Sequence, residues 1–345
     1  MKVLVAISGG IDSSTALFLL KNSGAYVEGV TLFLWSKKSH KRTCCSLEAV
    51  QRARKICYRY GVKHHVLNLE EEFEKIIVEE NFTNGYAKGI TPNPCVFCNR
   101  FFKFGFLYEE MEKRNFDFLA TGHYARIEKE NGKYFIKKAK DIEKDQSYFL
   151  AMISPNVLKK LLFPLGEITK KEVLKVAQEE NLFDFYEESQ DLCFVNESIS
   201  EFLKERLGER KGSIYFKDKK IGTHNGFYNF TIGQRKGLNV SIGERLYVSE
   251  IDPINNIVKV DFRRELMKKN IFVTQLNLFD KIRGEKKLMV KVRNLHKESP
   301  ARVKFYEDYA EIIFDVEQFA PTPGQIAAFY EDEILLGGGV ISDKR

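Results

Sequence analysis

Two cysteines, Cys95 and Cys98, stand three residues apart in the segment NPCVFCN, and no other pair of cysteines in the chain has this spacing. Such a pair can supply two of the four ligands of a zinc site, form a redox disulfide, or provide a nucleophile for sulfur chemistry. Six cysteines in 345 residues do not make a disulfide scaffold, so we expect thiols, metal ligands or catalytic groups. The pair alone does not decide among these chemistries.

The residues around this pair predict how it is held. Pro-Asn-Pro directly precedes Cys95 and predicts a rigid, extended backbone leading to the two cysteines. We expect a helix to begin just after Cys98, in the basic and aromatic run FFKFGFLYEEMEKR. A thiol near a helix N-terminus is biased towards thiolate, because the helix dipole favours the anion.

A second segment whose residues could take part in chemistry is AISGGIDSS, which spans residues 6–14. Gly9 and Gly10 allow backbone N–H groups to approach a phosphate, and the N-terminus of the helix that follows adds positive potential. The serines can donate hydrogen bonds, and Asp12 suits a magnesium ion held between phosphates. The segment is neither a Walker A loop nor a G-x-G-x-x-G motif. It predicts a phosphate-binding loop, with an ordinary glycine turn as the alternative.

The elements that must position these segments alternate along the first 150 residues. KVLVAI, YVEGVTLFLW, HHVLNL and FDFLATGHYA are typical of strands, with helical patterns between them. This alternation predicts βαβ units and a parallel sheet covered by helices on both faces. Asn131-Gly132 predicts a β-hairpin. From Gly212 to Arg345, short alternating runs broken by Gly and Pro predict hairpins and a small barrel or sandwich. We place domain boundaries near residues 196 and 266.

The net charge of +7 is mild but unevenly distributed. Residues 281–304 contain nine Lys or Arg and two Glu, and residues 201–245 contain ten Lys or Arg and five acidic residues. Such local basic surface suits a polyanionic partner, although solvated lysine-rich surface is the alternative. The apolar runs are short of a membrane span and the N-terminus runs directly into a strand, so we expect a cytoplasmic protein without a membrane segment.

The S-G-G-x-D-S pattern resembles the pyrophosphate loop of the ATP-pyrophosphatase superfamily. That resemblance implies cleavage of ATP between its α and β phosphates, adenylation of a carbonyl-type oxygen, and replacement of that oxygen by nitrogen or sulfur. Amidating members need ammonia, whereas thiolating members need a thiol, which Cys95 and Cys98 could supply.

Seven segments sharpen the resemblance, in one order across nearly the whole chain: SGGIDSS, TPNPCVFCNRFFKFG, ATGHYA, KDQSYFL, the cysteine of ESQDLCFV, FTIGQRKGL and PTPGQIAAFY. Together they resemble the tRNA-specific 2-thiouridylase family, which thiolates the wobble uridine of certain tRNAs. The resemblance implies an α/β catalytic domain with a parallel sheet, like the adenine-nucleotide α hydrolases, over residues 1–196. A β-rich central domain over 197–265 and a tRNA-binding C-terminal β-barrel over 266–345 would follow.

The resemblance also implies roles for individual residues. Cys98 would be the nucleophile, and Cys193 would carry persulfide sulfur received from a sulfur-donor protein. The ATP site, with Mg²⁺, would comprise Ala6, Ile7, Ser8, Gly9, Gly10, Ile11, Asp12, Ser13, Leu32 and Gly122. The tRNA site would comprise Asn93, Pro94 and Cys95 beside the target base, with His123, Lys144, Asp145, Gln146, Arg293, Asn294 and Gln325. We expect the chain to act as a monomer.

The chain departs from the family at Cys95, where many members have aspartate. A thiol with a pKa near 8.5 is mostly neutral and does not replace a carboxylate as a proton acceptor. Cys95, Cys98 and Cys193 could instead hold three irons of a [4Fe–4S] cluster, with persulfide chemistry without metal as the alternative. A structural zinc would need a fourth ligand, for which His123 is a candidate. We expect Cys57 to be a core residue, and Cys44 and Cys45 to be structural or incidental.

The sequence therefore predicts an ATP-dependent transfer of sulfur to the C2 position of a tRNA uridine. The C2 oxygen is a poor leaving group, and adenylation converts it into a good one. Two alternatives are an amidating or thiolating relative with a small-molecule substrate, and a non-catalytic RNA-binding protein whose cysteines hold zinc.

Overall fold

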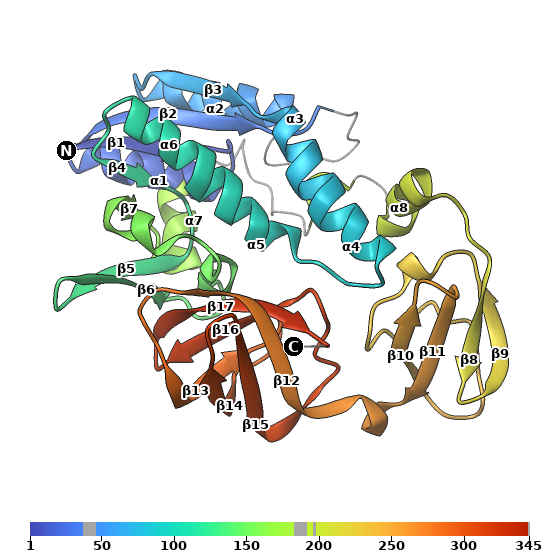
Figure 1. Cartoon of the computed structure of the whole chain (residues 1–345). Coiled ribbons are helices and arrows are strands. Elements are labelled where there is room, and N and C mark those ends of the chain that lie inside the picture. Colours follow the sequence, from blue (N-terminus) through green and yellow to red (C-terminus); the bar gives the residue numbers. More distant parts are fainter. Residues whose placement is uncertain (37–45, 183–191, 196–197, 344–345) are drawn as a thin grey trace. The chain divides into compact units, whose positions relative to one another are not determined.

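The structure is a computed structural model that describes residues 1–36, 46–182, 192–195 and 198–343. Cys44, Cys45 and Asp191 lie outside the described residues. The chain divides into two compact units (Figure 1). Unit 1 comprises Met1–Lys75, Cys95–Asn196 and Glu331–Gly337, and unit 2 comprises Ile76–Pro94, Glu197–Tyr330 and Gly338–Arg345.

A parallel sheet forms the centre of unit 1. Its strands follow the order β3-β2-β1-β4-β7, and every neighbouring pair is parallel, which confirms the fold class expected from the βαβ pattern. The central strand buries Val3, Leu4 and Val5 completely, as expected for a strand covered on both faces. The strands are β1 (Lys2–Ala6), β2 (Tyr26–Phe33), β3 (His64–Asn68), β4 (Phe118–Ala120) and β7 (Leu161–Leu162).

Helices cover this sheet. One face packs against α1, α2 and α7, and Cys57 lies in that core with no exposed surface, as expected. Burial raises the pKa of the Cys57 thiol to about 12, so the thiol stays neutral. The helices of unit 1 are α1 (Ile11–Asn22), α2 (Leu47–Arg59), α3 (Glu70–Phe73), the start of η1 (Glu74–Thr83), α5 (Pro94–Cys98), η2 (Asn99–Phe106), α6 (Leu107–Lys113), η3 (Ser147–Leu150), η4 (Pro155–Lys160) and α7 (Lys170–Glu179).

The helix that carries the cysteine pair begins earlier than predicted. α5 starts at Pro94, so Cys98 lies inside the helix rather than just before it. Proline fits the first helical position, because its φ is preset and the N–H that it lacks would have no intrahelical partner. α5 continues through the π-helical turns of η2 into α6. The strand predicted over FDFLATGHYA is also shorter: β4 ends at Ala120.

A β-hairpin follows, as Asn131-Gly132 predicts. β5 (Ala125–Glu130) and β6 (Lys133–Lys138) are antiparallel, and both turn residues have positive φ, 48° for Asn131 and 79° for Gly132. That pair of conformations is the type I′ turn. β6 also pairs with the first residues of β17, Ile334 and Leu335, which belong to unit 1.

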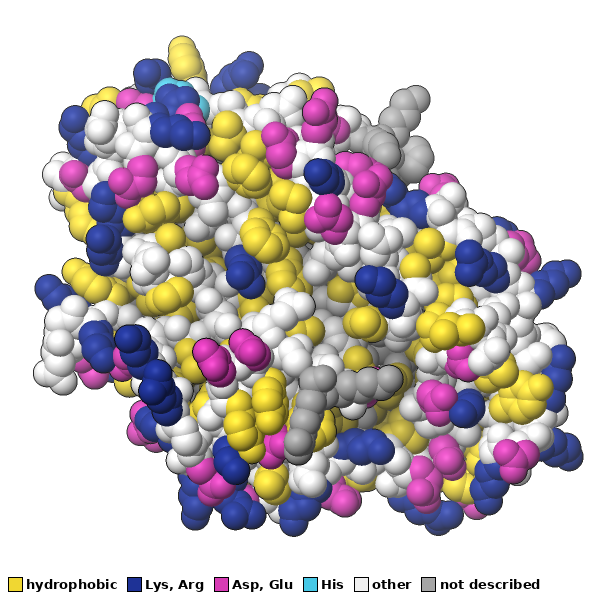
Figure 2. All heavy atoms as spheres, in the orientation of Figure 1, with side chains coloured by type: hydrophobic (Ala, Val, Ile, Leu, Met, Phe, Trp, Pro, Cys, Tyr) yellow, Lys and Arg dark blue, Asp and Glu magenta, His cyan; other side chains and the backbone are white. Residues whose placement is uncertain are grey.

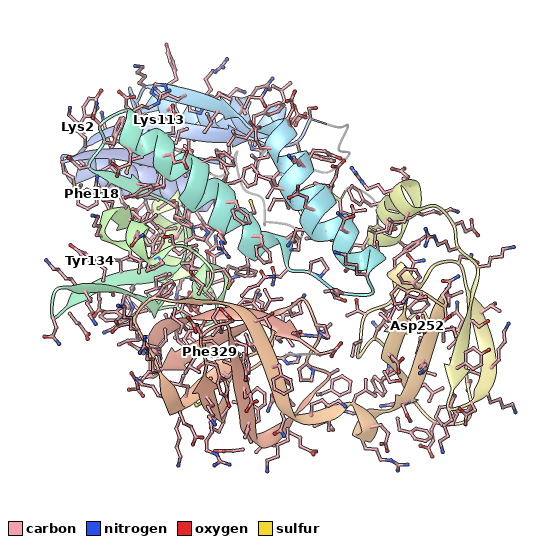
Figure 3. All side chains as sticks on the ribbon, viewed as in Figure 1. Lys2, Lys113, Phe118, Tyr134, Asp252 and Phe329 are labelled. Carbon is pink, nitrogen blue, oxygen red and sulfur yellow. The ribbon has the colours of Figure 1, made fainter. Side chains whose placement is uncertain are left out.

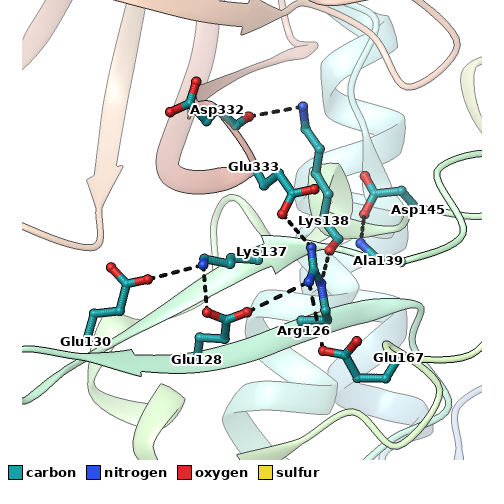
Figure 4. A network of polar contacts seen from close by, with 10 residues as sticks. All are labelled: Arg126, Glu128, Glu130, Lys137, Lys138, Ala139, Asp145, Glu167, Asp332 and Glu333. Carbon is teal, nitrogen blue, oxygen red and sulfur yellow. Dashed lines mark hydrogen bonds and ion pairs between the residues drawn. The ribbon is translucent and has the colours of Figure 1, made fainter.

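Ion pairs fasten this hairpin to the turn before β17 (Figure 4). The Arg126 Nη2 atom lies 2.7 Å from Glu333 Oε2, and Lys138 Nζ donates to the Asp332 carbonyl over 3.3 Å. Lys137 Nζ reaches Glu128 on the neighbouring strand over 2.6 Å. These contacts keep residues 332 and 333 with unit 1.

Unit 2 begins with short helices and a small mixed sheet. The sheet follows the order β10-β11-β8-β9, with β8 and β11 parallel. Asp252, at the end of β10, accepts backbone hydrogen bonds from Ile254 and Asn255 and closes the turn to β11 (Figure 3). The elements are α4 (Asn84–Ala87), α8 (Ile199–Leu207), β8 (Gly212–Phe216), β9 (Lys219–His224), η6 (Phe227–Asn229), β10 (Leu246–Asp252), β11 (Ile257–Phe262) and η7 (Arg263–Leu266).

The C-terminal strands close into a barrel, which confirms that expectation. They follow the order β12-β15-β14-β13-β16-β17, and a pairing between β12 and β17 completes the circle. Phe329 on β16 is fully buried and packs edge-on against Phe305, with ring centroids 5.3 Å apart (Figure 3). The strands are β12 (Met267–Leu278), β13 (Gly284–Lys291), β14 (Ser299–Phe305), β15 (Tyr309–Phe319), β16 (Ile326–Glu331) and β17 (Ile334–Ser342).

The surface mixes charges of both signs. On the face that Figure 2 shows, Lys and Arg side chains are interspersed with Asp and Glu. Among the described residues, no helix combines the length and the apolar character that a membrane crossing requires.

One histidine makes the stability of unit 1 depend on pH. His64 Nε2 lies 2.8 Å from Thr31 Oγ1, which donates to the Ile7 carbonyl over 2.6 Å. Burial, with a smaller effect of Arg54, lowers the pKa of His64 from 6.5 to about 4. Between these values the unfolded chain binds the proton and the folded chain does not, so stability falls as pH falls through this window.

We therefore expect the melting temperature to drop as the pH is lowered from about 7 to about 5, and to drop less in His64→Gln than in the wild type. Calorimetry across this range measures the difference. Equal pH slopes for wild type and His64→Gln would contradict the assignment.

Candidate functional site

The expected phosphate loop connects the end of β1 to α1. Gly9 has φ of +73°, and a Cβ added there would lie 2.6 Å from Arg52 Cβ and 2.9 Å from the Ala49 carbonyl oxygen. Only glycine therefore fits at this position. Gly10 is the N-cap of α1 and provides no side chain to bond the first amides of the helix. A helix N-terminus left in this way favours an anion.

Serine hydroxyls fix the shape of the loop. Ser13 Oγ accepts from the Ser8 N–H over 3.1 Å and also lies 3.1 Å from the Gly10 carbonyl oxygen, to which it donates. Ser14 Oγ donates to the same carbonyl over 2.8 Å. The hydrogen bonds cross the loop, so its backbone is held in place before any ligand binds.

Gly122 brings the ATGHYA segment directly onto this loop. A Cβ added at Gly122 would lie 2.8 Å from the Ser13 amide nitrogen and 2.9 Å from the Asp12 carbonyl carbon. The two backbones therefore touch, as the shared role predicted for the loop and Gly122 requires. Leu32, the other residue expected at the nucleotide, is nearly buried on the neighbouring strand β2.

Two side chains that the sequence analysis did not assign meet at Asp12. Its Oδ1 atom accepts from the Tyr124 hydroxyl over 2.8 Å and from Lys170 Nζ over 2.5 Å. Burial, then the Asp12 charge, raises the pKa of Tyr124 far above its usual value, so the hydroxyl stays a donor. Tyr124 belongs to the quoted ATGHYA motif, and Lys170 directly follows the Thr169 helix cap, but neither position signals an interaction with Asp12.

The residues predicted in KDQSYFL lie on one segment beside Tyr124. Gln146 is bonded to Tyr124 twice: its Oε1 accepts from the Tyr124 N–H over 3.0 Å, and its own N–H donates to the Tyr124 carbonyl over 2.8 Å. Asp145 accepts from the Ala139 N–H over 2.9 Å and from the Ser147 hydroxyl over 2.7 Å, which closes the turn. Lys144 is exposed.

His123 is buried between the rings of Phe104 and Phe163. Its Nδ1 lies 2.6 Å from Thr121 Oγ1, and its Nε2 lies 3.5 Å from Lys103 Nζ. Burial, with the charge of Lys103, lowers the pKa of His123 well below 6.5, so the ring is neutral. Because Lys103 lies on η2, this contact joins the ATGHYA segment to the helix that carries the cysteines.

Cys95 and Cys98 are half-buried on α5 and are not joined in a disulfide. Beside them, Asn99 is almost fully buried, and its Nδ2 donates to the Phe149 carbonyl over 3.1 Å. The Asn99 Oδ1 atom is buried without a hydrogen-bond partner. This acceptor beside the cysteine pair is available to a polar ligand or a water molecule.

An aromatic cluster links the segment of Cys193 to the same helix. Phe194 packs edge-on against Trp35 and Phe73, with centroids 6.1 and 5.8 Å apart. Phe73 in turn packs against Phe102 at 5.4 Å, and Phe102 lies one helical turn after Cys98. The half-buried Cys193 is thus held next to the cluster that anchors the Cys98 helix.

The remaining predicted residues belong to unit 2, and Pro94, where α5 starts, is the last residue of its first segment. Asn93 and Asn294 are half-buried. The Gln325 side-chain amide donates to the Thr91 and Pro92 carbonyls over 2.9 and 3.2 Å. Arg293 Nη2 donates to protein acceptors on other loops.

The expected metal sites find no support in this geometry. The described residues, which include Cys95, Cys98, Cys193 and His123, contain no group of three or more His, Cys, Asp or Glu able to hold a metal ion. The cluster and the zinc site that the sequence left open therefore have no assembled ligand set among the described residues.

Comparisons with known proteins agree across the chain. The family described as "tRNA methyl transferase HUP domain" matches residues 1–197, "tRNA methyl transferase PRC-barrel domain" matches 200–261, and "Aminomethyltransferase beta-barrel domain" matches 268–341. The tRNA-specific 2-thiouridylase MnmA of Thermotoga sp. (strain RQ2) is 40% identical over 357 residues, 99% of each chain. Its counterpart from Carboxydothermus hydrogenoformans is 39% identical over 358 residues, which cover 99% of this chain and 98% of the relative.

A third relative, tRNA-specific 2-thiouridylase MnmA 1 of Caldanaerobacter subterraneus subsp. tengcongensis, is 39% identical over 358 residues, again 99% of this chain and 98% of the relative. Similarity at this level, from one end of the chain to the other, shows that the chain belongs to the tRNA-specific 2-thiouridylase family.

Proposed function

We propose that the chain transfers sulfur to C2 of the wobble uridine of tRNA and uses ATP to activate the C2 oxygen. One observation carries the proposal: the ATGHYA segment touches the phosphate loop through Gly122 and the cysteine helix through His123. A nucleotide on the loop and a thiol on the helix can therefore serve one substrate. The relatives' printed activity, 2-thiouridylation of tRNA, supplies the identity of that substrate.

ATP binds along the loop in this proposal. The backbone of residues 6–13 and the N-terminus of α1 surround the phosphates, and Leu32 and Gly122 line the adenosine. Magnesium usually takes one or two carboxylates together with phosphate oxygens, and Asp12 can supply a carboxylate. Lys170, which is paired with Asp12 in the structure, could contact the pyrophosphate if magnesium took the carboxylate.

The sulfur chemistry uses Cys193 and Cys98. Attack of the uridine C2 oxygen on the α-phosphate releases pyrophosphate and forms an adenylate. The terminal sulfur of a Cys193 persulfide attacks C2 and displaces AMP. The Cys98 thiolate then attacks Cys193 Sγ and breaks the S–S bond, so the terminal sulfur keeps the electron pair and stays on C2. A Cys98–Cys193 disulfide remains, which an external thiol reduces.

Cys95 stands beside the target base without replacing the carboxylate that many relatives have. The uridine must leave its stack for C2 to reach the site, and Asn93, Pro94 and Cys95 are the residues we place against it. The buried Asn99 Oδ1 atom supports a polar ligand at this point. Cys98 is the fifth residue of the helix that starts at Pro94, so it lies just beyond the first turn, where the helix dipole favours an anion most.

The partners follow from this reaction. The predicted tRNA contacts are His123, Lys144, Asp145, Gln146, Arg293, Asn294 and Gln325. Among these, the exposed Lys144 suits a phosphate contact, which positions the RNA without reading its sequence. A sulfur-donor protein loads the persulfide onto Cys193. We propose that the chain works as a monomer, in the cytoplasm where tRNA and ATP are available.

Three domains divide the work in this proposal: residues 1–196 catalyse, 197–265 connect, and 266–345 hold the tRNA. Three separate family matches, over 1–197, 200–261 and 268–341, support these boundaries. The compact units cut the chain differently, because residues 76–94 pack with the central and C-terminal strands.

Cys98→Ser and Cys193→Ser test the proposed reaction. Each removes a sulfur that the transfer needs, so we expect tRNA thiolation, with ATP and a persulfide donor, to fall at least about a thousandfold. Retardation of tRNA in mercury-containing gels measures the thiolated product. Cys57→Ala, in the core away from the helix of the pair, is the control and should keep the activity of the wild type. Normal thiolation by both serine variants would reject the proposal, and pyrophosphate release without tRNA would favour a small-molecule substrate.

Lys170→Met tests the nucleotide site. Loss of the ammonium leaves the Asp12 carboxylate uncompensated beside the phosphates, so we expect ATP to bind about 10- to 100-fold more weakly. Calorimetric titration with ATP and magnesium measures the affinity. Lys171→Met, an exposed lysine on the same helix turn, is the matched control. Equal affinities in the two variants would show that Lys170 does not serve the nucleotide.

A further inference from the structure

A junction in unit 2 holds the segment that leads into the cysteine helix. Both hydrogens of the Gln325 side-chain amide are used, on the carbonyls of Thr91 and Pro92. The Thr91 N–H donates to the Pro323 carbonyl over 3.1 Å. Gly324 has φ of +90°, and a Cβ there would lie 2.2 Å from Ile90 Cγ2 and 2.8 Å from the Thr91 carbonyl oxygen. The turn after β15 is therefore pressed against this segment.

Arg293 fixes the other side of the same turn. Its Nη2 atom donates to the Ala320 carbonyl over 3.2 Å, to the Ile232 carbonyl over 3.1 Å, and to the Thr322 hydroxyl. Ala320 has φ of 47°, a left-handed conformation that costs a non-glycine residue free energy. Such a conformation persists only where its surroundings impose it, and the guanidinium is one of those restraints.

A third contact closes the junction. Thr91 Oγ1 donates to Thr231 Oγ1 over 3.2 Å, and Thr231 directly precedes the Ile232 carbonyl that Arg293 binds. The segment Thr91–Pro92 is thus held by the 320–325 turn and by the loop that starts at Thr231. We call this set of residues, Thr91, Thr231, Arg293, Thr322 and Gln325, the clamp.

We propose that Arg293 and Gln325 are positioning residues, which through the clamp fix the point where α5 starts and so the setting of Cys98 for sulfur transfer. Only Asn93 separates the clamped Pro92 from Pro94, the first residue of α5. The consequence for sulfur transfer rests on the proposed function, whereas the clamp itself does not.

The direction of the side chains favours this role over simple attraction of RNA. The Arg293 Nη2 atom donates to uncharged acceptors of the protein, and the Gln325 side-chain amide donates to two backbone carbonyls. Lysine would retain the charge of Arg293 but could not reproduce a planar guanidinium that reaches three acceptors. Arg293→Lys therefore separates the two roles: a phosphate contact tolerates it and a clamp does not.

The experiment measures the clamp in the full-length chain without tRNA. In Arg293→Lys and Gln325→Met we expect the Thr91 amide to exchange hydrogen at least about tenfold faster, since its bond to Pro323 is loosened. Alkylation of Cys98 by iodoacetamide, resolved from Cys95 by fragmentation mass spectrometry, should change its rate in the same variants. Thr231→Val, which is isosteric, should give a smaller change in the same direction.

Activity and binding complete the test. We expect Arg293→Lys, which keeps the charge for a contact with tRNA, to lower kcat about tenfold and by a larger factor than it weakens the Kd for tRNA. Arg264→Lys is the matched control for this exchange, because Arg264 is 75% exposed in unit 2 and pairs only with its neighbour Glu265 among the described ion pairs. It should match the wild type in every readout.

The clamp is overturned if hydrogen exchange at Thr91 and alkylation of Cys98 in Arg293→Lys and Gln325→Met both equal those of the wild type, in proteins whose circular dichroism shows them folded. It is equally overturned if these variants lose tRNA affinity alone. Exchange and alkylation need no thiolation, so a failure of the proposed reaction leaves this test decisive.

Discussion

The contact of Gly122 with the start of α1 is the constraint on which the site depends. A methyl group at that position would lie 2.8 Å from the Ser13 amide nitrogen, so the two backbones can approach only because the side chain is absent. The two residues that follow Gly122 make contacts with different elements. Tyr124 reaches Asp12 in the phosphate loop, and His123 reaches Lys103 on the cysteine helix. The ATGHYA segment thus connects the phosphate loop with the cysteine helix.

The surrounding structure stabilises this arrangement by burial rather than by surface charge. The aromatic cluster of Trp35, Phe73, Phe102 and Phe194 joins the first segments of unit 1 to the cysteine helix and to the residue after Cys193. Aromatic pairs of this geometry contribute about 0.5–1.5 kcal/mol each beyond their buried area. The cluster thus relates two cysteine segments that are far apart in sequence, as the proposed reaction needs.

Local sequence signals predicted much of this fold. Gly9 and Asn131-Gly132 each indicate a backbone conformation that only a few residues tolerate, and the structure has the loop and the hairpin at these positions. The alternation of strand and helix predicted the parallel sheet. The predicted start of α5 was wrong. Proline is unfavourable at most positions of a helix but suits the first one, so the sequence placed the start after Cys98 whereas the helix begins at Pro94.

Contacts between distant segments could not be predicted in this way. Lys170 lies 158 residues from Asp12, and nothing in the sequence around either residue identifies the other as its partner. The family resemblance implies a tRNA contact for Arg293, but no feature of the sequence indicated that its Nη2 donor also binds two carbonyls and a hydroxyl of the protein. The charge of a side chain indicates which groups it can bind, but the fold determines which of these groups lie within its reach.

A single turnover of tRNA thiolation on protein loaded with persulfide sulfur tests most directly whether the loop and the cysteines serve one reaction. The account predicts that 2-thiouridine, AMP and the Cys98–Cys193 disulfide form in equal amounts and at the same rate. Thiouridine that forms without AMP, or with both cysteines still reduced, would contradict it.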